Sequence, residues 1–308
     1  MLQVVRRDEE QSFAEGWDDR GSGEEEQTKT RTFKYVDDLT VVGSTPMEGA
    51  ISHITTRKER RWVRALGMER TYANIVKNSE NLGMRIHPEK TKILCISAAK
   101  NYDLETYMKL PTGTVKGEES VRVLGFTFGN RPGVHDQVKA MKRKFASKLW
   151  VIRHLKRVGI EPGKLVQIYT SLLRSSIEYG SVIYDGLLTK EQVTQIERLQ
   201  SNALKTIYGW DKSYATAREM AGLETLAERR KNAVKNFAQK TSRNPRFAER
   251  WFPANPEVGY GLRKRNAYAT EYARTERLRN APLYRMRRIM NGEEVDEMGV
   301  DDLETAVE

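Results

Sequence analysis

Apolar and polar positions divide the chain into a first part that favours short strands and a second part that favours helices. In residues 33–43, apolar residues stand on both sides of the adjacent carboxylates Asp37 and Asp38. Such a run predicts a strand, a turn at the two aspartates and a second strand. Residues 121–128 predict another pair of short alternating strands, hinged at Gly125.

The segment between these two hairpins predicts one helix and further extended elements. Residues 47–82 carry an imperfect helical stripe that is broken near Gly67 and ends before Gly83, which suits a left-handed cap. Residues 84–87 and 92–96 predict a strand and its continuation after a turn. The polar residues 98–120 predict a hairpin or an insertion.

A long amphipathic helix is predicted after residue 133. Its apolar residues step by three or four positions and form one face, made of Val134, Val138, Met141, Phe145, Leu149, Ile152 and Leu155. Its other faces carry eight basic residues against one acid, Asp136. The eight are Lys139, Lys142, Arg143, Lys144, Lys148, Arg153, Lys156 and Arg157. A phosphate backbone suits such a wall; the alternative is a solvated helix face.

Further helices are predicted up to residue 252. One begins at Pro162, with a core face of Leu165, Ile168, Tyr169, Leu172, Leu173 and Ile177. The next begins after Thr189, with Gln192 in the capping-box position, and ends at Gly209. Shorter helices follow at 213–222 and around 226–238. Trp251 and Phe252 end this part, and we expect them in a small core rather than stacked on bases.

The net charge of +11 conceals an uneven distribution. Residues 1–30 carry four basic and nine acidic groups, and residues 291–308 carry eight acidic and no basic groups. Residues 31–290 therefore have a net charge of +24. A basic body with acidic ends predicts a polyanionic partner, with nucleic acid as the first candidate.

The cysteine content and the absence of long apolar runs limit the kinds of site and the cellular location that we expect. A single cysteine, Cys95, excludes an intramolecular disulfide and a multi-cysteine zinc site. No apolar run approaches the roughly 20 residues that span a bilayer, so we expect an intracellular protein without a membrane partner. Residues 1–30 are acidic, without periodicity, and are expected to be disordered.

The two aspartates of the first hairpin are the candidate metal site. Two adjacent carboxylates repel each other when buried, and a divalent cation removes this cost. Mg²⁺ prefers carboxylate and phosphate oxygens, so a hairpin of this kind can hold Mg²⁺ (or Mn²⁺) against a phosphate. The alternative is a solvated turn between two ordinary strands.

Several motifs together resemble the reverse transcriptases of non-LTR (LINE-type) retrotransposons. Residues 35–39, Tyr-Val-Asp-Asp-Leu, resemble the catalytic hairpin of that family. Residues 82–92 resemble the next palm element, and residues 123–126 resemble the primer-grip turn. Residues 177–180 and 196–205 resemble the thumb and the region after it. The resemblance covers roughly residues 31–252, in the order that the family has.

The resemblance implies a reaction and roles for particular residues. The reaction is RNA-directed DNA polymerisation, in which a primer 3′-hydroxyl attacks a dNTP on an RNA template with two metal ions. Asp37 and Asp38 would hold metal, Tyr35 would lie near the primer terminus, and Lys90 (or Lys92) would lie near the triphosphate. The residues implied for the primer grip are Leu124, Gly125 and Phe126, for which a simple core hairpin is the alternative. Residence in the nucleus also follows from the resemblance.

The expected fold class is α+β: a partial polymerase palm, with a small antiparallel sheet and helices, followed by an all-α thumb-like region. The expected divisions are an acidic N-terminus (1–30), the palm (31–130), the helical thumb (131–210), a helical extension (211–252), and a basic arm with an acidic tail (253–308). The basic arm would be disordered in part, either as a tail or as an arm that orders on nucleic acid.

The family palm also needs an earlier aspartate and fingers, and only 34 residues precede Tyr35. We therefore expect this chain alone to polymerise poorly, or to need an upstream polymerase fragment in trans. The competing hypothesis is a non-catalytic basic helical module that binds RNA or DNA, as a transposon remnant would. A protein-interaction scaffold is a third class, against which the positive charge of the body argues.

Overall fold

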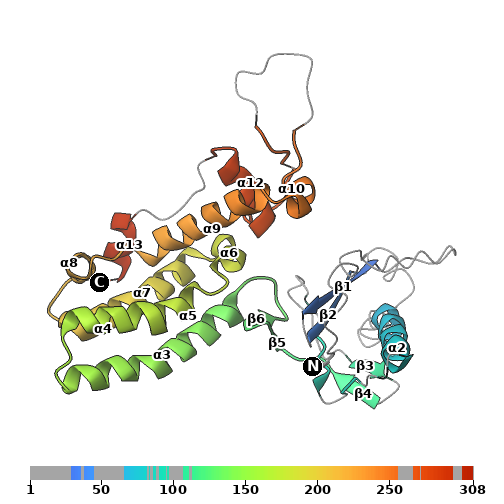
Figure 1. The fold of residues 1–308 in the computed structure, drawn as a ribbon, viewed down its shortest axis with the longest axis horizontal. Coiled ribbons are helices and arrows are strands. Elements are labelled where there is room, and N and C mark those ends of the chain that lie inside the picture. The colour runs from blue at the N-terminus through green and yellow to red at the C-terminus, as the bar shows by residue number, and fades with distance from the viewer. Residues whose placement is uncertain are drawn as a thin grey trace, which may run out of the picture. The chain divides into compact units, whose positions relative to one another are not determined.

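The computed structural model describes most of the chain from residue 113 onward and parts of what precedes it. For residues 29–35, 38–44, 66–71, 107–110 and 300–301 it describes the backbone alone. The described residues are 29–35, 38–44, 66–81, 83, 86–87, 90–94, 96, 107–110, 113–255, 266–270, 272–293 and 300–307. They form two compact units, residues 1–132 and 133–308 (Figure 1).

The described part of the first unit consists of three antiparallel hairpins and one helix. Each hairpin is a separate two-stranded sheet. The strands are β1 (Lys29–Tyr35) with β2 (Asp38–Ser44), β3 (Tyr107–Leu110) with β4 (Gly113–Lys116), and β5 (Ser120–Val123) with β6 (Phe126–Gly129). The helix α2 (Leu66–Asn81) packs against β3 and is followed by Gly83 at φ 72°. The predicted hairpins and the left-handed Gly83 are therefore confirmed, but Asp38 begins β2 as the partner of Tyr35 and does not lie in the turn.

The strands predicted at 84–87 and 92–96 are not formed by the residues described there, whereas the predicted turn between them is present. Within them only Ile93 makes a strand-like contact, an isolated parallel bridge to Gly117. The backbone N–H of Lys90 and the hydroxyl of Thr91 both donate to the carbonyl of His87, at 3.2 and 3.1 Å. This turn uses the carbonyl that a strand would have offered to a neighbour.

The regular elements described in the second unit are all helices, and an isolated antiparallel bridge joins Ala254 and Tyr268. Its longest helices are α3 (His135–Arg157), α7 (Lys190–Tyr208) and α9 (Leu226–Ser242). The shorter ones are α4 (Pro162–Ile168), the π-helix η2 (Tyr169–Arg174), α5 (Ser175–Glu178), α6 (Ser181–Tyr184), the 3₁₀ turn η3 (Asp185–Leu187), α8 (Tyr214–Ala221), α10 (Pro245–Trp251), α11 (Glu276–Arg279), α12 (Pro282–Met290) and α13 (Val300–Val307). Helix α7 contacts α3, α4, α8, α9 and α13, so it organises the bundle (Figure 1).

The predicted helical stripes become the core of this bundle. Of the α3 stripe, all but Leu155 are buried, and α7 buries Ile196, Leu199, Leu204 and Ile207. The predicted capping box forms: Gln192 N donates to Thr189 Oγ1 at 3.2 Å, and Thr189 N donates to Gln192 Oε1 at 3.0 Å. Local capping and burial therefore favour the same start for α7.

The stretch from Pro162 to Glu178 differs from the prediction in its period. Its buried residues are spaced by four: Leu165, Tyr169, Leu173 and Ile177. A regular α-helix with 3.6 residues per turn would carry this series off its face, and the wider π-turns of η2 keep it in line. Leu172, which we expected in the core, is consequently 37% exposed.

The region expected to be a basic arm contains α12, which packs on α9. Phe252 is buried beside Val234, Ala238 and Met286, and Trp251 packs against this cluster, as the core interpretation predicted. A buried ion triad links α12 to α9 and η3. Asp185 Oδ1 accepts from Arg230 Nε at 3.0 Å, and Asp185 Oδ2 accepts from Arg285 Nη2 at 2.8 Å. Arg287 and Arg288 are also buried.

The class predicted at the coarse level, α+β with antiparallel hairpins before a helical region, is the class observed. Among the described helices, none is both long enough and apolar enough to cross a bilayer.

Candidate nucleic-acid interface

The two strands that flank the predicted catalytic turn are paired in register. Tyr35 is the partner of Asp38, and the pairing continues to Lys29 with Ser44. Asp37 lies outside the described residues, as do the side chains of Tyr35 and Asp38. No cluster of three metal-ligating side chains occurs in the part of the chain that the structure describes, which does not include these carboxylates. The predicted Mg²⁺ site thus stays a prediction.

The two lysines considered for the triphosphate differ in their surroundings. Lys90 lies in the turn after His87 and is exposed. Lys92 forms an ion pair with Glu118 at 3.7 Å, with both side chains about half exposed. Of the two, Lys90 is the one for which the structure records no acidic partner among the described residues.

The hairpin predicted as the primer grip has a strained turn. Leu124 and Gly125 connect β5 to β6 with φ angles of 48° and 86°. Two successive positive φ angles define a type I′ turn, which favours Asn or Gly at the first position. Leu124 is nevertheless 46% exposed there, whereas Phe126 is buried. The turn therefore presents a leucine to solvent at a cost in backbone energy.

Helix α3 brings together the predicted nucleic-acid-binding residues. Residues 137–157 contain no acidic side chain. At about 100° per residue, Lys139, Arg143, Trp150, Arg153 and Arg157 fall within an arc of about 80° on the side away from the core. All five are exposed. We call these five residues the basic face of α3.

Three of the other predicted lysines donate hydrogen bonds within the bundle. Lys142 Nζ donates to Gln195 Oε1 at 3.1 Å, and Lys156 Nζ donates to the carbonyl of Thr206 at 2.8 Å, both in α7. Lys148 Nζ donates to the carbonyl of Leu172 at 2.9 Å. Partial burial, and secondarily the charge of Lys144, lower the pKa of Lys148. Lys144 is exposed on the same flank as Lys148, outside the basic face.

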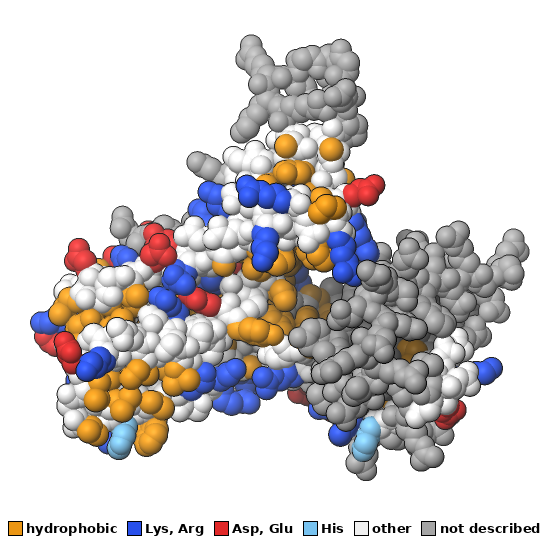
Figure 2. Space-filling model, viewed as in Figure 1, with side chains coloured by type: hydrophobic (Ala, Val, Ile, Leu, Met, Phe, Trp, Pro, Cys, Tyr) orange, Lys and Arg blue, Asp and Glu red, His pale blue; other side chains and the backbone are white. Residues whose placement is uncertain are grey.

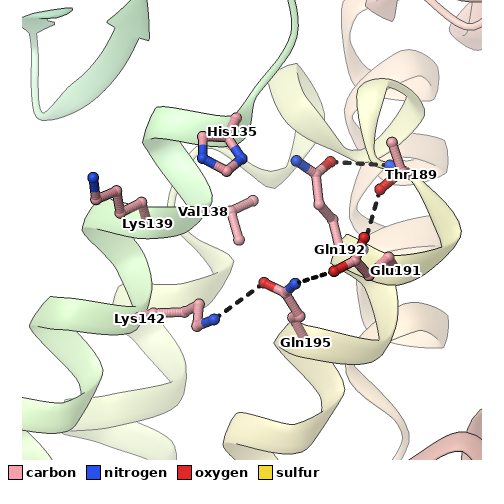
Figure 3. A pocket seen from close by; sticks show the side chains of 8 residues that line it. All are labelled: His135, Val138, Lys139, Lys142, Thr189, Glu191, Gln192 and Gln195. Atoms are coloured by element: carbon pink, nitrogen blue, oxygen red, sulfur yellow. Dashed lines mark hydrogen bonds between the residues drawn. The ribbon is translucent and has the colours of Figure 1, made fainter.

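A shallow pocket of about 480 Å³ lies between the first turns of α3 and α7 (Figure 3). His135, Val138, Lys139 and Lys142 form one wall, and Thr189, Glu191, Gln192 and Gln195 form the other. Gln195 joins the walls, because its oxygen accepts from Lys142 and its Nε2 donates to Glu191 Oε1 at 2.9 Å. Seven of the eight lining residues have polar or charged side chains, and the pocket borders the basic face through Lys139.

Trp150 is a candidate site residue that was not predicted from the sequence. This residue is 62% exposed, and its ring stacks on His154 with centroids 5.2 Å apart and an interplanar angle of 17°. In Figure 2, Lys and Arg side chains lie along α3, and hydrophobic side chains are exposed over its C-terminal end. An apolar residue within the polar wall of the predicted helix was the available signal.

No protein-family model matches this chain, and no significantly similar curated protein or solved structure was found.

Proposed function

We propose that the chain is a reverse transcriptase fragment of the non-LTR retrotransposon type, whose helical unit binds nucleic acid through the basic face of α3. The observation that carries the binding proposal is the face itself: four exposed cations and an exposed tryptophan on a helix segment without acids. Exposed cations on one face of a helix can neutralise phosphates of a nucleic-acid backbone. The polymerase part of the proposal is supported by the three palm motifs that resemble the family, residues 35–39, 82–92 and 123–126.

In this proposal Asp37 and Asp38 supply carboxylates for Mg²⁺ (or Mn²⁺), and the chemistry of this donor set fits a hard cation. When bound, the metal would stabilise the negative charge that develops during transfer of a dNTP to a primer. In the same proposal, the ammonium group of Lys90 lies near the triphosphate. The turn between β5 and β6 positions the primer end. Thumb and palm are the proposed identities of the helical unit and of the hairpins.

Binding is tested by fluorescence anisotropy on a 20-base-pair RNA–DNA hybrid across a salt series. Each phosphate contact contributes about 0.9 to the slope of log K against log salt concentration. Replacing Arg143, Arg153 and Arg157 with Gln should reduce the magnitude of this slope by up to about 2.7, since three contacts at about 0.9 each are lost. The matched control replaces three exposed cations of the α9 region, Lys235, Lys240 and Arg243, and should change the slope less. Equal effects of both triple variants would refute a specific role for α3.

Catalysis is tested separately by primer extension on an RNA template with Mg²⁺ and dNTPs. Extension that Asp37→Ala abolishes would support the polymerase proposal and would overturn the expectation that this chain alone polymerises poorly. The second candidate, a non-catalytic binding module, is favoured by the same basic face. It predicts salt-sensitive binding that neither Mg²⁺ nor Asp37→Ala changes, and no extension by the wild-type chain.

A further inference from the structure

We infer that Trp150 is a stacking platform for an unpaired base, so that the basic face of α3 prefers a duplex with a single-stranded extension to a blunt duplex. This inference rests on the proposed nucleic-acid binding and adds the form of nucleic acid that is bound. It starts from the exposure of Trp150, at 62%, on a helix whose other large apolar residues are mostly buried. Exposing an indole is unfavourable unless another group covers it.

The two helical turns next to Trp150 differ in the size of their side chains. Side chains in a helix lean toward its N-terminus, so the indole of Trp150 extends over the preceding turn. That turn carries Ala146 and Ser147, which are small, and Ser147 Oγ donates back to the carbonyl of Lys144 at 2.8 Å. His154 stacks on the ring from the following turn. One aromatic face is thus supported, and the turn on the other side has no bulky side chain.

The charges around Trp150 favour a nucleotide over an apolar partner. Arg143 lies seven residues before it and Arg157 seven residues after it, each about 10 Å along the helix axis. Arg153 lies one turn away on the same side. A protein surface docked on this indole, or a second copy of α3, would have to neutralise these guanidinium groups. An unpaired base brings its own phosphates, which can reach the arginines on either side.

Only an unpaired base can use this platform fully. Bases inside a duplex are already stacked on their neighbours, whereas a base in a single-stranded extension offers its face to an aromatic side chain. The cations of the face contact phosphates in either form, so they bind both. We therefore place the selectivity for an extension in Trp150 and the general affinity in the arginines and Lys139.

The experiment compares the full chain on a blunt RNA–DNA hybrid and on the same hybrid with a four-nucleotide single-stranded extension. The wild-type chain should bind the extended hybrid about tenfold more tightly, a gain typical of one stacked base. Trp150→Ala should abolish this preference, so that the variant binds the two hybrids with equal affinity. Trp150→Phe should retain part of the preference, because the phenyl ring still stacks.

The control is Trp210→Ala, which removes a tryptophan that is 66% exposed and stands next to Asp211. It should keep the tenfold preference, and thermal unfolding should show that all variants are folded. Equal binding of both hybrids by the wild-type chain would overturn the inference and leave the binding proposal intact, as would a preference that Trp150→Ala retains. Absence of salt-sensitive binding to either hybrid would overturn both.

Discussion

Lys148 Nζ donates a hydrogen bond to the carbonyl oxygen of Leu172, 2.9 Å away, and so joins α3 to the π-helix η2. This contact gives Lys148 a structural role, although the sequence predicted that it binds nucleic acid. The sequence places Lys148 with seven other basic residues, whereas the fold directs its ammonium group to the backbone of a neighbouring helix. Its lowered pKa, caused first by desolvation and then by Lys144, is consistent with this position.

Replacing Lys148 with Met should therefore affect stability more than nucleic-acid binding. Methionine keeps much of the apolar stem and loses the donor, so we expect the free energy of unfolding to fall by about 1 kcal/mol. Chemical denaturation measures this change. Lys144→Met, at an exposed position one turn earlier, is the control and should leave stability nearly unchanged. If Lys148→Met instead keeps full stability and weakens binding as Arg143→Gln does, Lys148 contacts phosphate.

Glu197 is a buried carboxylate at the contact of α7, α8 and α9. Its Oε1 accepts from the hydroxyl of Tyr214 at 2.5 Å and from the backbone N–H of Leu226 at 2.9 Å. Burial raises the pKa of Glu197 above its ordinary value of 4.5, and the two hydrogen bonds oppose this shift. A raised folded-state pKa means that the native state binds the proton more tightly than the unfolded state. Stability from this group is full below pH 4.5 and is lost as the pH rises through the folded pKa.

Glu197→Gln should remove this pH dependence while an amide oxygen can still accept both hydrogen bonds. The difference in unfolding free energy, variant minus wild type, should increase as the pH rises from 4.5 to 7. Denaturant titrations at several pH values measure it. Glu219→Gln, which changes an exposed glutamate of α8, should show a much smaller trend. A difference that is constant with pH would show that Glu197 has the same pKa in both states.

The sequence predicts those parts of the fold in which apolar side chains are buried and polar side chains are exposed. In α3 and α7 the apolar residues recur every three or four positions, so pattern and burial coincide. In α12 they do not, because Arg285, Arg287 and Arg288 are buried by hydrogen bonding and ion pairing. An arginine in a sequence predicts a solvent-exposed side chain. That these arginines are buried follows only from the folded positions of their partners, such as Asp185 and the carbonyl of Trp251.

The candidate site shows the same division. The cations of α3 could be predicted because their excess over acids is visible in the sequence. The engagement of Lys142, Lys148 and Lys156 by neighbouring helices could not, since each acceptor lies at least 24 residues away along the chain. The roles implied for Asp37 and Asp38 depend on the family resemblance, and they stay predictions.

The turn of the β5–β6 hairpin offers a test of local strain. Leu124 has a φ of 48°, a conformation that Asn adopts more readily than Leu. Leu124→Asn should therefore stabilise the hairpin by about 1 kcal/mol. Hydrogen exchange of the Val121 and Phe128 amides, which lie on paired residues of the two strands, should slow in the variant. Val123→Asn is the control, because it adds the same side chain outside the turn. Faster exchange in Leu124→Asn would mean that contacts of the leucine side chain stabilise the hairpin by more than its positive φ angle destabilises it.

Gly186 is the position where the packing of α12 is most sensitive to one added carbon. A Cβ at this residue would overlap the carbonyl oxygen of Asn280 and would lie 2.7 Å from Cδ of Arg285. Gly186→Ala should therefore displace the segment that carries the Asp185–Arg285 ion pair, with a loss of 1–3 kcal/mol, about the cost of overpacking. Gly163→Ala is a matched substitution, since a Cβ there meets no atom within 4 Å and the residue is in α4. It should stabilise the protein by about 0.5 kcal/mol through helix propensity. The midpoint temperature of thermal unfolding should fall for Gly186→Ala and rise for Gly163→Ala. A Gly186→Ala variant as stable as wild type would show that α12 and η3 are not in the close contact that the Asp185–Arg285 ion pair requires.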